Sequence, residues 1–557
     1  MKAGFRPSLA TWSWLAAVLL MVGEFLLFDA MTSRYHASVY PRWNDQIQYL
    51  TESYYAYDEM KAHGLAAGLK YAWETPAVQG KLHNTAAVVI FWLTGSASRS
   101  AALSLNLFVL IAWQAALLFT LPRVTGSRTL GWMGFGLVLA IAFPWSAEAG
   151  SAVDFRLDHG AMCLFGVTAC AALLTDGFRS TRWSLALGVA AGVTLLERFL
   201  SGAYLGPIFF LTGLYLLFTP DRWIRLRNLL FAGLVVAVMA LPVFWINREG
   251  IYGYYWQGHV TNAESAARLR GFDLAQSVRF VLGHLGDQQL GAWFGRTAAG
   301  LTGLLLMFRL GWRRKHAAGL AGDWLFFGLL FLLVPALVLV IHPQKSEAVL
   351  GIMVPGTILL VLWMWRLLWS RTEFPAARAW QRLLPVLPAV AALAAGGTYF
   401  VRRELTPPHR PEFLDSARQI NQVADYIFTT VTAAKLAHPS VGVDRIVDYI
   451  DGRILRVMCY ERHHAWINFT VNLPDSILAQ SDDNVFLKLQ LCDFMILTDY
   501  MAGHGYWPYD QQMERLYPRL KAWCDERMRL TEVFSVFERD MTLYQRKELP
   551  WPPATPQ

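Results

Sequence analysis

The feature that most constrains the fold of this chain is a series of apolar runs, each close to the length that crosses a lipid bilayer. The first runs from Leu9 to Phe28. Further runs lie at about 101–121, 129–144, 160–175, 183–200, 203–219, 228–246, 297–310, 323–341, 348–369 and 384–401. Because about 20 apolar residues in a helix span the hydrocarbon core of a membrane, the sequence predicts a polytopic α-helical membrane protein with about eleven transmembrane helices.

The composition and the N-terminus agree with this prediction. Of the 557 residues, 55% are hydrophobic and only 16% are charged, a balance that is uncommon in water-soluble domains. The opening run follows Lys2 and Arg6 and so resembles a signal peptide, but no small-x-small cleavage site follows it before Tyr35. We therefore expect a retained first helix with its N-terminus in the cytoplasm.

The basic residues alternate with the predicted spans. The short external loops hold little more than Arg156, Arg198 and Lys345, whereas the predicted cytoplasmic turns carry clusters at 123–128, 179–182, 222–227, 309–315 and 366–382. Since cytoplasmic loops are rich in Lys and Arg, this distribution favours the proposed orientation. It also explains most of the net charge of +8, so no nucleic-acid partner is expected.

The apolar stretch Thr85–Leu93 fits this orientation only if it does not cross the membrane. It is too short to span unaided, and Gly95-Ser96-Ala97-Ser98-Arg99 follows it directly. We expect a helix that lies in, or dips into, the outer interface. The first external loop then covers about residues 29–100.

A charged, proline-bearing junction at 402–408 separates the membrane domain, 1–401, from a polar C-terminal domain, 402–557. The latter is long enough to bury its own core. Strands are predicted at Ser440–Val443, Trp466–Val471, Phe494–Thr498, Val533–Phe537 and Met541–Tyr544, and helices at Asp415–Ala434, Val485–Leu491 and Asp510–Arg527. We therefore expect an external, periplasmic α/β domain. An oxidising compartment would permit one disulfide among Cys459, Cys492 and Cys524, but their spacing favours no pair.

Asp45 is the leading catalytic candidate. It lies in Tyr40-Pro41-Arg42-Trp43-Asn44-Asp45-Gln46, just past the first helix, where a lipid headgroup would emerge. A carboxylate at this point is suited to act as a general base that takes the proton from an attacking hydroxyl. The alternative is a solvated acid on an interfacial helix. The chain contains no P-loop, zinc-ligand spacing or G-x-S-x-G motif.

Other external loops supply candidate substrate-binding residues. Asp154, Arg156 and Asp158 suit metal coordination, orientation of sugar hydroxyls or an internal ion pair, and Glu197 at the end of the fifth span is either functional or snorkelling. His259 and Arg270 lie in an aromatic-rich loop suited to sugar and phosphate recognition, although an ordered surface loop could look the same. Lys345 stands on the face where lysine is disfavoured, which predicts a bound phosphate or, alternatively, a snorkelling side chain.

In order along the chain, these features resemble the GT-C superfamily of membrane glycosyltransferases, which includes the protein O-mannosyltransferases and the lipid A aminoarabinose transferase. The matching features are an early acid in the first external loop, an interfacial segment, an acid-bearing second loop, a late basic loop and a C-terminal external domain; the residues concerned are Asp45, Gly95, Asp154, Asp158, Lys345 and Pro355.

The resemblance implies a polyprenyl-phosphate-linked sugar donor and a lipid, glycan or protein acceptor on the external face. By position, Asp45 corresponds to the family's catalytic base and Lys345 to the basic residue that contacts the donor phosphate. Many relatives have Asp-Glu where this chain has Asn44-Asp45-Gln46, and Lys-Arg-x-x-Tyr where Lys345 is followed by Ser346 and Glu347. No cofactor is expected, and a divalent metal is left open. The expected location is a bacterial inner membrane, with an endoplasmic reticulum membrane as the alternative.

Two other classes of function are compatible with the sequence. A multi-span transporter should show paired repeats and broken helices near the membrane midplane. A non-catalytic scaffold or sensor would bind a ligand through its external domain. The enzyme hypothesis instead predicts that Asp45, Asp154 or Asp158 and Lys345 line one pocket at the outer membrane surface.

Overall fold

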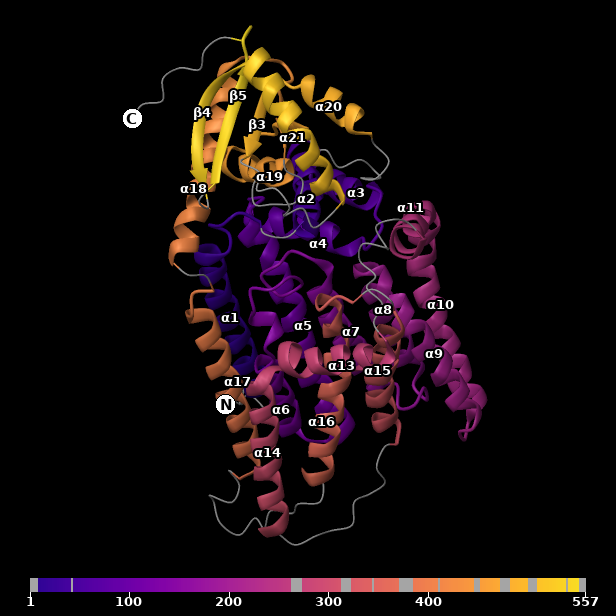
Figure 1. Ribbon diagram of the computed structural model, residues 1–557. Helices are drawn as coiled ribbons and strands as arrows, with labels where there is room; N and C mark the ends of the chain where they lie inside the picture. The colour runs from indigo at the N-terminus through magenta and orange to yellow at the C-terminus, as the bar shows by residue number, and fades with distance from the viewer. Residues whose placement is uncertain are drawn as a thin grey trace, which may run out of the picture.

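A helical bundle carries a smaller α/β domain at one end, with a layer of short helices between them (Figure 1). The computed structural model describes residues 9–41, 44–261, 273–311, 322–342, 345–369, 384–408, 411–444, 451–470, 481–498, 508–536 and 539–549. We call the end of the bundle that carries the α/β domain the domain face, and the other end the opposite face.

The bundle is built from long helices joined by short helical connections. The helices are α1 (Leu9–Tyr35), α5 (Arg99–Thr125), α6 (Arg128–Leu139), α7 (Leu157–Leu174), α8 (Thr181–Glu197), α9 (Gly202–Leu217), α10 (Arg222–Ile246), α14 (Gly291–Gly311), α15 (Gly322–Ile341), α16 (Val354–Trp369) and α17 (Leu387–Leu405). The connections include η1 (Phe143–Trp145), η2 (Phe199–Ser201), α11 (Arg248–Tyr252), η3 (Gly253–Thr261), α13 (Leu274–His284), η4 (Leu285–Leu290), η5 (Ala348–Met353) and η7 (Leu384–Val386).

Within the described ranges, seven helical stretches are long and apolar enough to cross a membrane. They are Trp12–Tyr35, Arg99–Thr125, Leu157–Leu174, Phe199–Leu217, Arg222–Ile246, Asp323–Ile341 and Ala348–Trp369. The other four predicted spans correspond to α6 and α8, which are short at 12 and 17 residues, and to α14 and α17, which carry arginines. All four pack against other helices of the bundle, with α6 on α17, α8 on α7 and α10, and α14 on α16 and α17. The protein is therefore a polytopic helical membrane protein, as predicted.

The segment between α1 and α5, predicted as the first external loop, folds into the layer between the bundle and the α/β domain (Figure 1). It contains α2 (Asn44–His63), α3 (Leu65–Glu74) and α4 (Leu82–Thr94), which pack on one another (Figure 1). The predicted interfacial stretch Thr85–Leu93 lies within α4, whose 13 residues are too few to span a bilayer. Gly95, at φ 69°, ends this helix in the left-handed conformation that glycine adopts readily.

The C-terminal domain is α/β, as predicted. It contains α18 (Pro411–Ala433), β1 (Ser440–Val443), α19 (Gly452–His463), β2 (Asn468–Thr470), α20 (Asp482–Gln490), β3 (Phe494–Thr498), α21 (Pro508–Arg527), β4 (Met528–Val536) and β5 (Arg539–Arg546). The strand order is β2-β1-β3-β5-β4. The sheet is mixed, because β1 pairs in parallel with β2 and β3, whereas β5 pairs antiparallel with β3 and β4.

Helix α19, the end of α17 and the cysteines complete the comparison of this part of the chain with the sequence analysis. Helix α19 was not predicted, although Asp451 caps it by accepting hydrogen bonds from the backbone N–H groups of Arg453 and Ile454. Helix α17 also runs past the predicted boundary at 402 and ends at Leu405. All five cysteines are free and buried, so Cys459, Cys492 and Cys524 form no disulfide.

The C-terminal domain contacts α2 and the start of α5 through α19 and the residues just after it. The Tyr54 hydroxyl donates to Glu461 at 2.6 Å, and the Arg99 guanidinium pairs with the same carboxylate at 2.9 Å. Asp58 accepts from the Tyr460 hydroxyl at 2.5 Å and from the indole N–H of Trp466 at 2.7 Å. Helix α2, which carries Asp45 in its first turn, is therefore held between the bundle and the C-terminal domain.

Candidate functional site

The candidate site forms where three segments of the domain face meet. Asp45 lies in the first turn of α2, Asp158 lies in the first turn of α7 and Arg156 is the residue before α7. Arg198 follows the last residue of α8 in an extended conformation. Carboxylates in the first turn of a helix are stabilised by its N-terminal partial positive charge, so the local fold favours both acids where they stand.

Arg156 is the centre of the cluster. Its Nη2 lies 2.8 Å from Asp45 Oδ2, and its Nε lies 3.5 Å from Asp158 Oδ2 and 3.9 Å from Asp154 Oδ2. Burial works to lower the pKa of Arg156, but the three carboxylates outweigh it and hold that pKa well above its ordinary value. The predicted trio Asp154, Arg156 and Asp158 is thus an internal ion-pair network, and the network also includes Asp45.

Arg198 is a second cation of this cluster. Its Nη1 lies 2.5 Å from Asp158 Oδ1, and the carboxylate raises its pKa despite burial. The hydroxyl of Tyr49 is an electrostatic neighbour of Asp45, Arg156 and Arg198, and burial raises the pKa of Tyr49 above its ordinary value. A neutral phenol therefore borders the network.

Asp154 is the innermost of the three acids. Its Oδ2 accepts a hydrogen bond from the backbone N–H of Gly150 at 2.6 Å, and burial raises its pKa to about 8. Gly150 has φ 83°, and a Cβ on it would come within 2.8 Å of Ala348 Cβ. The loop that holds Asp154 thus packs directly on η5.

Exposure separates Asp45 from the other carboxylates. The side chain of Asp45 is 39% exposed, whereas those of Asp154 and Asp158 are each 1% exposed. A buried carboxylate that is surrounded by protein cannot reach a substrate without a rearrangement. Asp45 is therefore the acid of this network that a substrate can meet directly.

Glu197 is buried beneath the network and pairs with His83. Its Oε1 lies 2.8 Å from His83 Nδ1, and both side chains are at most 3% exposed. The His83 ring lies 4.3 Å from the ring of Phe155, the residue before Arg156. A Cβ on Gly160 would come within 2.1 Å of Glu197 Oε1, so glycine makes room for this carboxylate. Here Glu197 supports the segments that carry Arg156 and Arg198.

Two backbone hydrogen bonds tie the start of α4 to the end of α8. The N–H of Lys81 donates to the carbonyl of Leu196, and the N–H of Phe199 donates to that of Gln79, both at 2.7 Å. Between them, a Cβ on Gly80 would come within 2.0 Å of the Glu197 carbonyl oxygen. The close approach of these segments requires glycine at position 80.

Lys81 is a buried cation that the sequence analysis did not single out. Its Nζ donates to the carbonyl of Thr75, and burial lowers its pKa to about 8 while Glu52 opposes the shift. Glu52 in turn accepts a hydrogen bond from Asn84 at 2.5 Å. The signal was available, because a lysine in the predicted first external loop breaks the predicted charge pattern in the same way as Lys345.

Lys345 lies just past the end of α15. Its Nζ donates to the carbonyls of Leu339, Val340 and His342 at 2.7 to 3.0 Å, and so caps the end of α15. Two residues on, the Glu347 carbonyl accepts from Gln289 at 3.0 Å, and Ala348 packs on Gly150. The segment that follows Lys345 therefore contacts the loop of Asp154 through Ala348. Contact with a phosphate stays a prediction.

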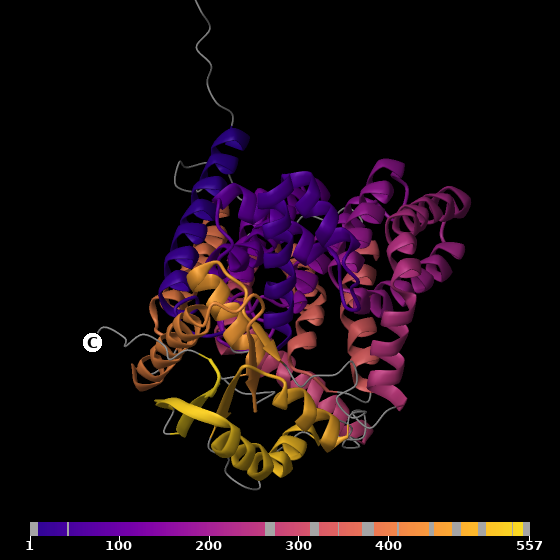
Figure 2. The same ribbon diagram turned by 90° about the horizontal axis from the view of Figure 1, so that it is seen from above.

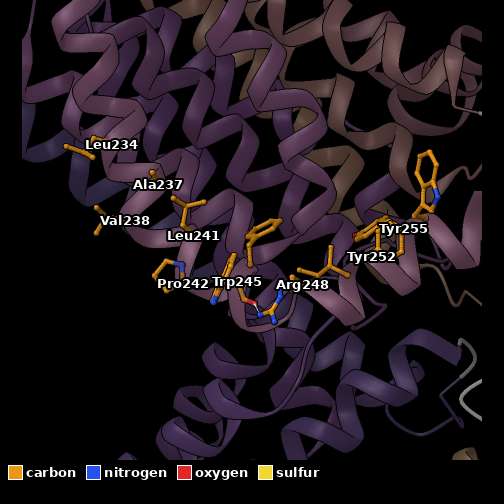
Figure 3. Close-up of a pocket in the computed structure, with 12 residues that line it drawn as sticks. Leu234, Ala237, Val238, Leu241, Pro242, Trp245, Arg248, Tyr252 and Tyr255 are labelled. Carbon is orange, nitrogen blue, oxygen red and sulfur yellow. Dashed lines mark hydrogen bonds between the residues drawn. The ribbon is translucent and has the colours of Figure 1, made fainter.

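An open apolar groove of about 1100 Å³ runs along α10 and ends near the cluster (Figure 3). Leu234, Val238 and Leu241 follow one another along its wall, and Trp245, Arg248, Tyr252 and Tyr255 lie toward its other end. The C-terminal domain covers another side of the bundle, away from the magenta helices that hold this groove (Figure 2).

Tyr255 joins the groove to the ion-pair network. It lines the groove, and Arg198 and Asp158 are its electrostatic neighbours. Arg248 stands at the same end, where its Nη1 donates to the Trp245 carbonyl at 2.8 Å and its side chain is 54% exposed. An apolar surface with a cationic end thus leads to the carboxylates.

The remaining predicted residues lie outside the region that can be described. The backbone of His259 belongs to η3, but its side chain is outside the described residues, and so is the whole of Arg270. In the described part of the chain, no group of three or more His, Cys, Asp or Glu side chains is arranged to hold a metal ion.

Comparisons with known proteins identify solved structures with a similar fold. No family model and no curated protein sequence matches the chain. The crystal structure of ArnT from Cupriavidus metallidurans in the apo state superposes with a TM-score of 0.57 at 15% identity, covering 96% of this chain and 98% of that one. The same protein bound to undecaprenyl phosphate gives 0.56 at 16% identity, covering 97% and 99%. The chain therefore shares the fold of ArnT along nearly its whole length.

Proposed function

We propose that this protein is an integral-membrane glycosyltransferase that moves a sugar from a polyprenyl-phosphate-linked donor to a lipid, glycan or protein acceptor at the domain face. The observation that carries the proposal is a partly exposed carboxylate, Asp45, held 2.8 Å from Arg156 where an apolar groove approaches an ion-pair network. An enzyme that acts on a lipid-borne sugar needs these two features side by side.

In this proposal Asp45 is the general base. The acceptor hydroxyl attacks the anomeric carbon, and Asp45 takes its proton as the new glycosidic bond forms. The bond between that carbon and the phosphate oxygen breaks, and its electron pair leaves with the polyprenyl phosphate. A single displacement of this kind inverts the anomeric configuration. Arg156 fixes the direction of the Asp45 carboxylate, because an arginine-carboxylate hydrogen bond is strong and directional.

The groove along α10 suits the polyprenyl chain of the donor. Its wall is apolar, and Arg248 at its end offers a cation to the phosphate. Lys345 and Arg198 are further candidates for the phosphate, and Arg270 and His259 for the sugar. The structure of ArnT, a lipid A aminoarabinose transferase, with bound undecaprenyl phosphate supports a donor of this class.

The proposed location is a bacterial inner membrane, with the domain face in the periplasm. The basic residues at the ends of α5, α14 and α16 and at the starts of α8 and α10 then lie in the cytoplasm, in keeping with the positive-inside rule.

The class of reaction is tested with the purified protein and a panel of radiolabelled polyprenyl-phosphate sugars, offered with membrane lipid extract as acceptor. Transfer of label from one donor supports the proposal. If no donor reacts while the protein binds or moves solutes in liposomes, a scaffold or a transporter explains the fold better.

The role of the groove in binding the polyprenyl chain of the donor is tested by a substitution that narrows it. Val238→Trp places an indole in the groove, and we expect KM for a long-chain donor to rise about tenfold, while a short-chain donor analogue is unaffected. Val189→Trp is the matched control, since Val189 is also exposed, at 48%, on the neighbouring helix α8 but does not line the groove. Equal effects of the two variants would remove the groove from donor binding.

A further inference from the structure

A polar pocket, distinct from the apolar groove along α10, lies at the opposite face of the bundle, away from the ion-pair network. It has a volume of about 200 Å³ and is enclosed by the start of α1, the end of α5 and the start of α6. Trp14, Pro122, Arg123, Arg128 and Trp132 are among its lining residues. Two guanidinium groups and two indoles thus face one small cavity.

The pocket has a positive charge without a counter-charge. None of its lining residues is acidic. Arg123 is fixed in place, because its Nη1 donates to the Phe119 carbonyl at 2.8 Å and its guanidinium lies 3.3 Å from the centre of the Phe119 ring. Among the described residues, the guanidinium group of Arg128 has no hydrogen-bond or ion-pair partner. One preorganised cation and one available cation therefore stand together, as an anion would require.

The residues around the pocket suit the binding of a lipid headgroup. Trp132 donates through its indole N–H to the Ser13 hydroxyl at 3.1 Å, which ties α6 to α1. Next to the opening, α1 exposes the apolar side chains of Leu15, Val18 and Leu19, at 47% to 63%. Tryptophan marks the boundary between hydrocarbon and water. Acyl chains can therefore run along α1 while the attached headgroup enters the pocket.

We propose that this pocket binds the headgroup of an anionic phospholipid, with Arg123 and Arg128 on its phosphate and its acyl chains against α1. A free phosphate ion would use the two arginines but not the apolar surface of α1. The site is separate from the proposed active site, so it stands whether or not the protein transfers sugars.

The proposal is tested by native mass spectrometry of the full-length protein in detergent, titrated with phosphatidylglycerol or phosphatidylcholine. Detergent removes the surface potential of a bilayer, so the measurement reports a site rather than general attraction to a charged membrane. We expect phosphatidylglycerol to bind the wild type about tenfold or more tightly than phosphatidylcholine, and Arg123→Gln with Arg128→Gln to abolish that preference.

The matched control removes two other arginines from the same face. Arg182 and Arg222 are exposed, lie at the starts of α8 and α10 and each stack near a tryptophan, Trp183 and Trp223, but neither lines the pocket. Arg182→Gln with Arg222→Gln should bind phosphatidylglycerol as the wild type does. Arg128→Gln alone, which breaks no observed contact, should lose part of the preference and guards against misfolding of the double variant.

Three results would overturn the proposal. The first is unchanged phosphatidylglycerol binding in the double variant. The second is an equal loss in the control. The third is displacement of the lipid by millimolar inorganic phosphate, which would make the pocket a site for a free anion.

Discussion

The buried pair between His83 and Glu197 allows a sharp test of how the candidate site is held together. Glu197 precedes Arg198, and the His83 ring packs on Phe155, which precedes Arg156. Glu197→Gln keeps the shape of the side chain but removes its charge. The charge-assisted hydrogen bond of 2.8 Å to His83 then becomes a neutral one, and both arginines lose part of their support.

The size of the effect follows from these contacts. Exchanging a buried charge-assisted hydrogen bond for a neutral one lowers the free energy of unfolding by about 1–2 kcal/mol. A small shift of Arg198 lengthens its 2.5 Å contact with Asp158. Since a displacement of about 1 Å in an active site lowers a rate by up to about a hundredfold, we expect transfer to fall between about tenfold and a hundredfold.

The control is a second buried pair on the same helices. Thr194 on α8 and Thr168 on α7 share a hydrogen bond of 2.9 Å, and Thr168 also donates to its own helix at Leu164. Thr194→Val removes the bond to Thr168 and the 2.8 Å bond from the Thr194 hydroxyl to the Ala190 carbonyl; both are neutral, and the loss lowers the free energy of unfolding by about 1–2 kcal/mol. The hydrogen bond from the Arg198 backbone N–H to the Thr194 carbonyl, at 3.2 Å, does not involve the substituted side chain and is kept in the variant, so its transfer rate should stay unchanged.

The assay compares unfolding in detergent with transfer at a temperature where both variants are folded. Similar losses of stability with a selective loss of transfer in Glu197→Gln would support the positioning role. Full activity of Glu197→Gln, or an equal loss in Thr194→Val, would refute the reasoning.

Three further predictions concern the same framework. Burial raises the pKa of Asp154 to about 8, so its contribution to stability is present below about pH 4 and is lost as the pH rises through 8. In Asp154→Asn the free energy of unfolding should therefore decline less between pH 5 and 9 than in the wild type. Equal declines in the free energy of unfolding of the two proteins over this pH range would contradict this. Glu461→Ala leaves a buried guanidinium without its carboxylate and should lower the free energy of unfolding by about 3 kcal/mol, whereas a loss near zero in denaturant titration would show the pair to be unimportant. Gly80→Ala would place a Cβ within 2.0 Å of the Glu197 carbonyl and should reduce the yield of folded protein, while Gly206→Ala, which meets no atom within 4 Å, should not; equal yields would argue against the close approach.

Much of the fold could be predicted because membrane spans and buried strands leave strong local patterns. The run Phe494–Thr498 is apolar throughout and became the strand β3, all of whose residues are buried. The short stretch before Gly95 was recognised by its length. Helix α19 was not predicted, because charged residues interrupt the apolar pattern of the face that packs on α2 and α18.

The candidate site was predictable only in part. The alternation of loops placed four of its residues on one face: Asp45, Asp154, Arg156 and Asp158. The structure brings the three carboxylates together around the guanidinium of Arg156. The role of Glu197 could not be predicted, because its partner His83 lies 114 residues away and nothing in the local sequence links them.

Position along the chain also could not reveal the protein contacts of Lys345. Its ammonium group caps α15, and its expected contact with a phosphate stays a prediction. A hydrogen bond to a nearby carbonyl depends on side-chain conformation, which charge patterns along a chain do not specify.

The most direct test of the account is the transfer rate of Asp45→Asn under saturating donor and acceptor, measured beside Glu59→Gln. Glu59 lies on the same helix and is paired with His63 at the surface. We expect Asp45→Asn to transfer sugar about 10²- to 10⁴-fold more slowly while it still binds the donor, and Glu59→Gln to match the wild type. A near-normal rate in Asp45→Asn would contradict the role of Asp45 as the base.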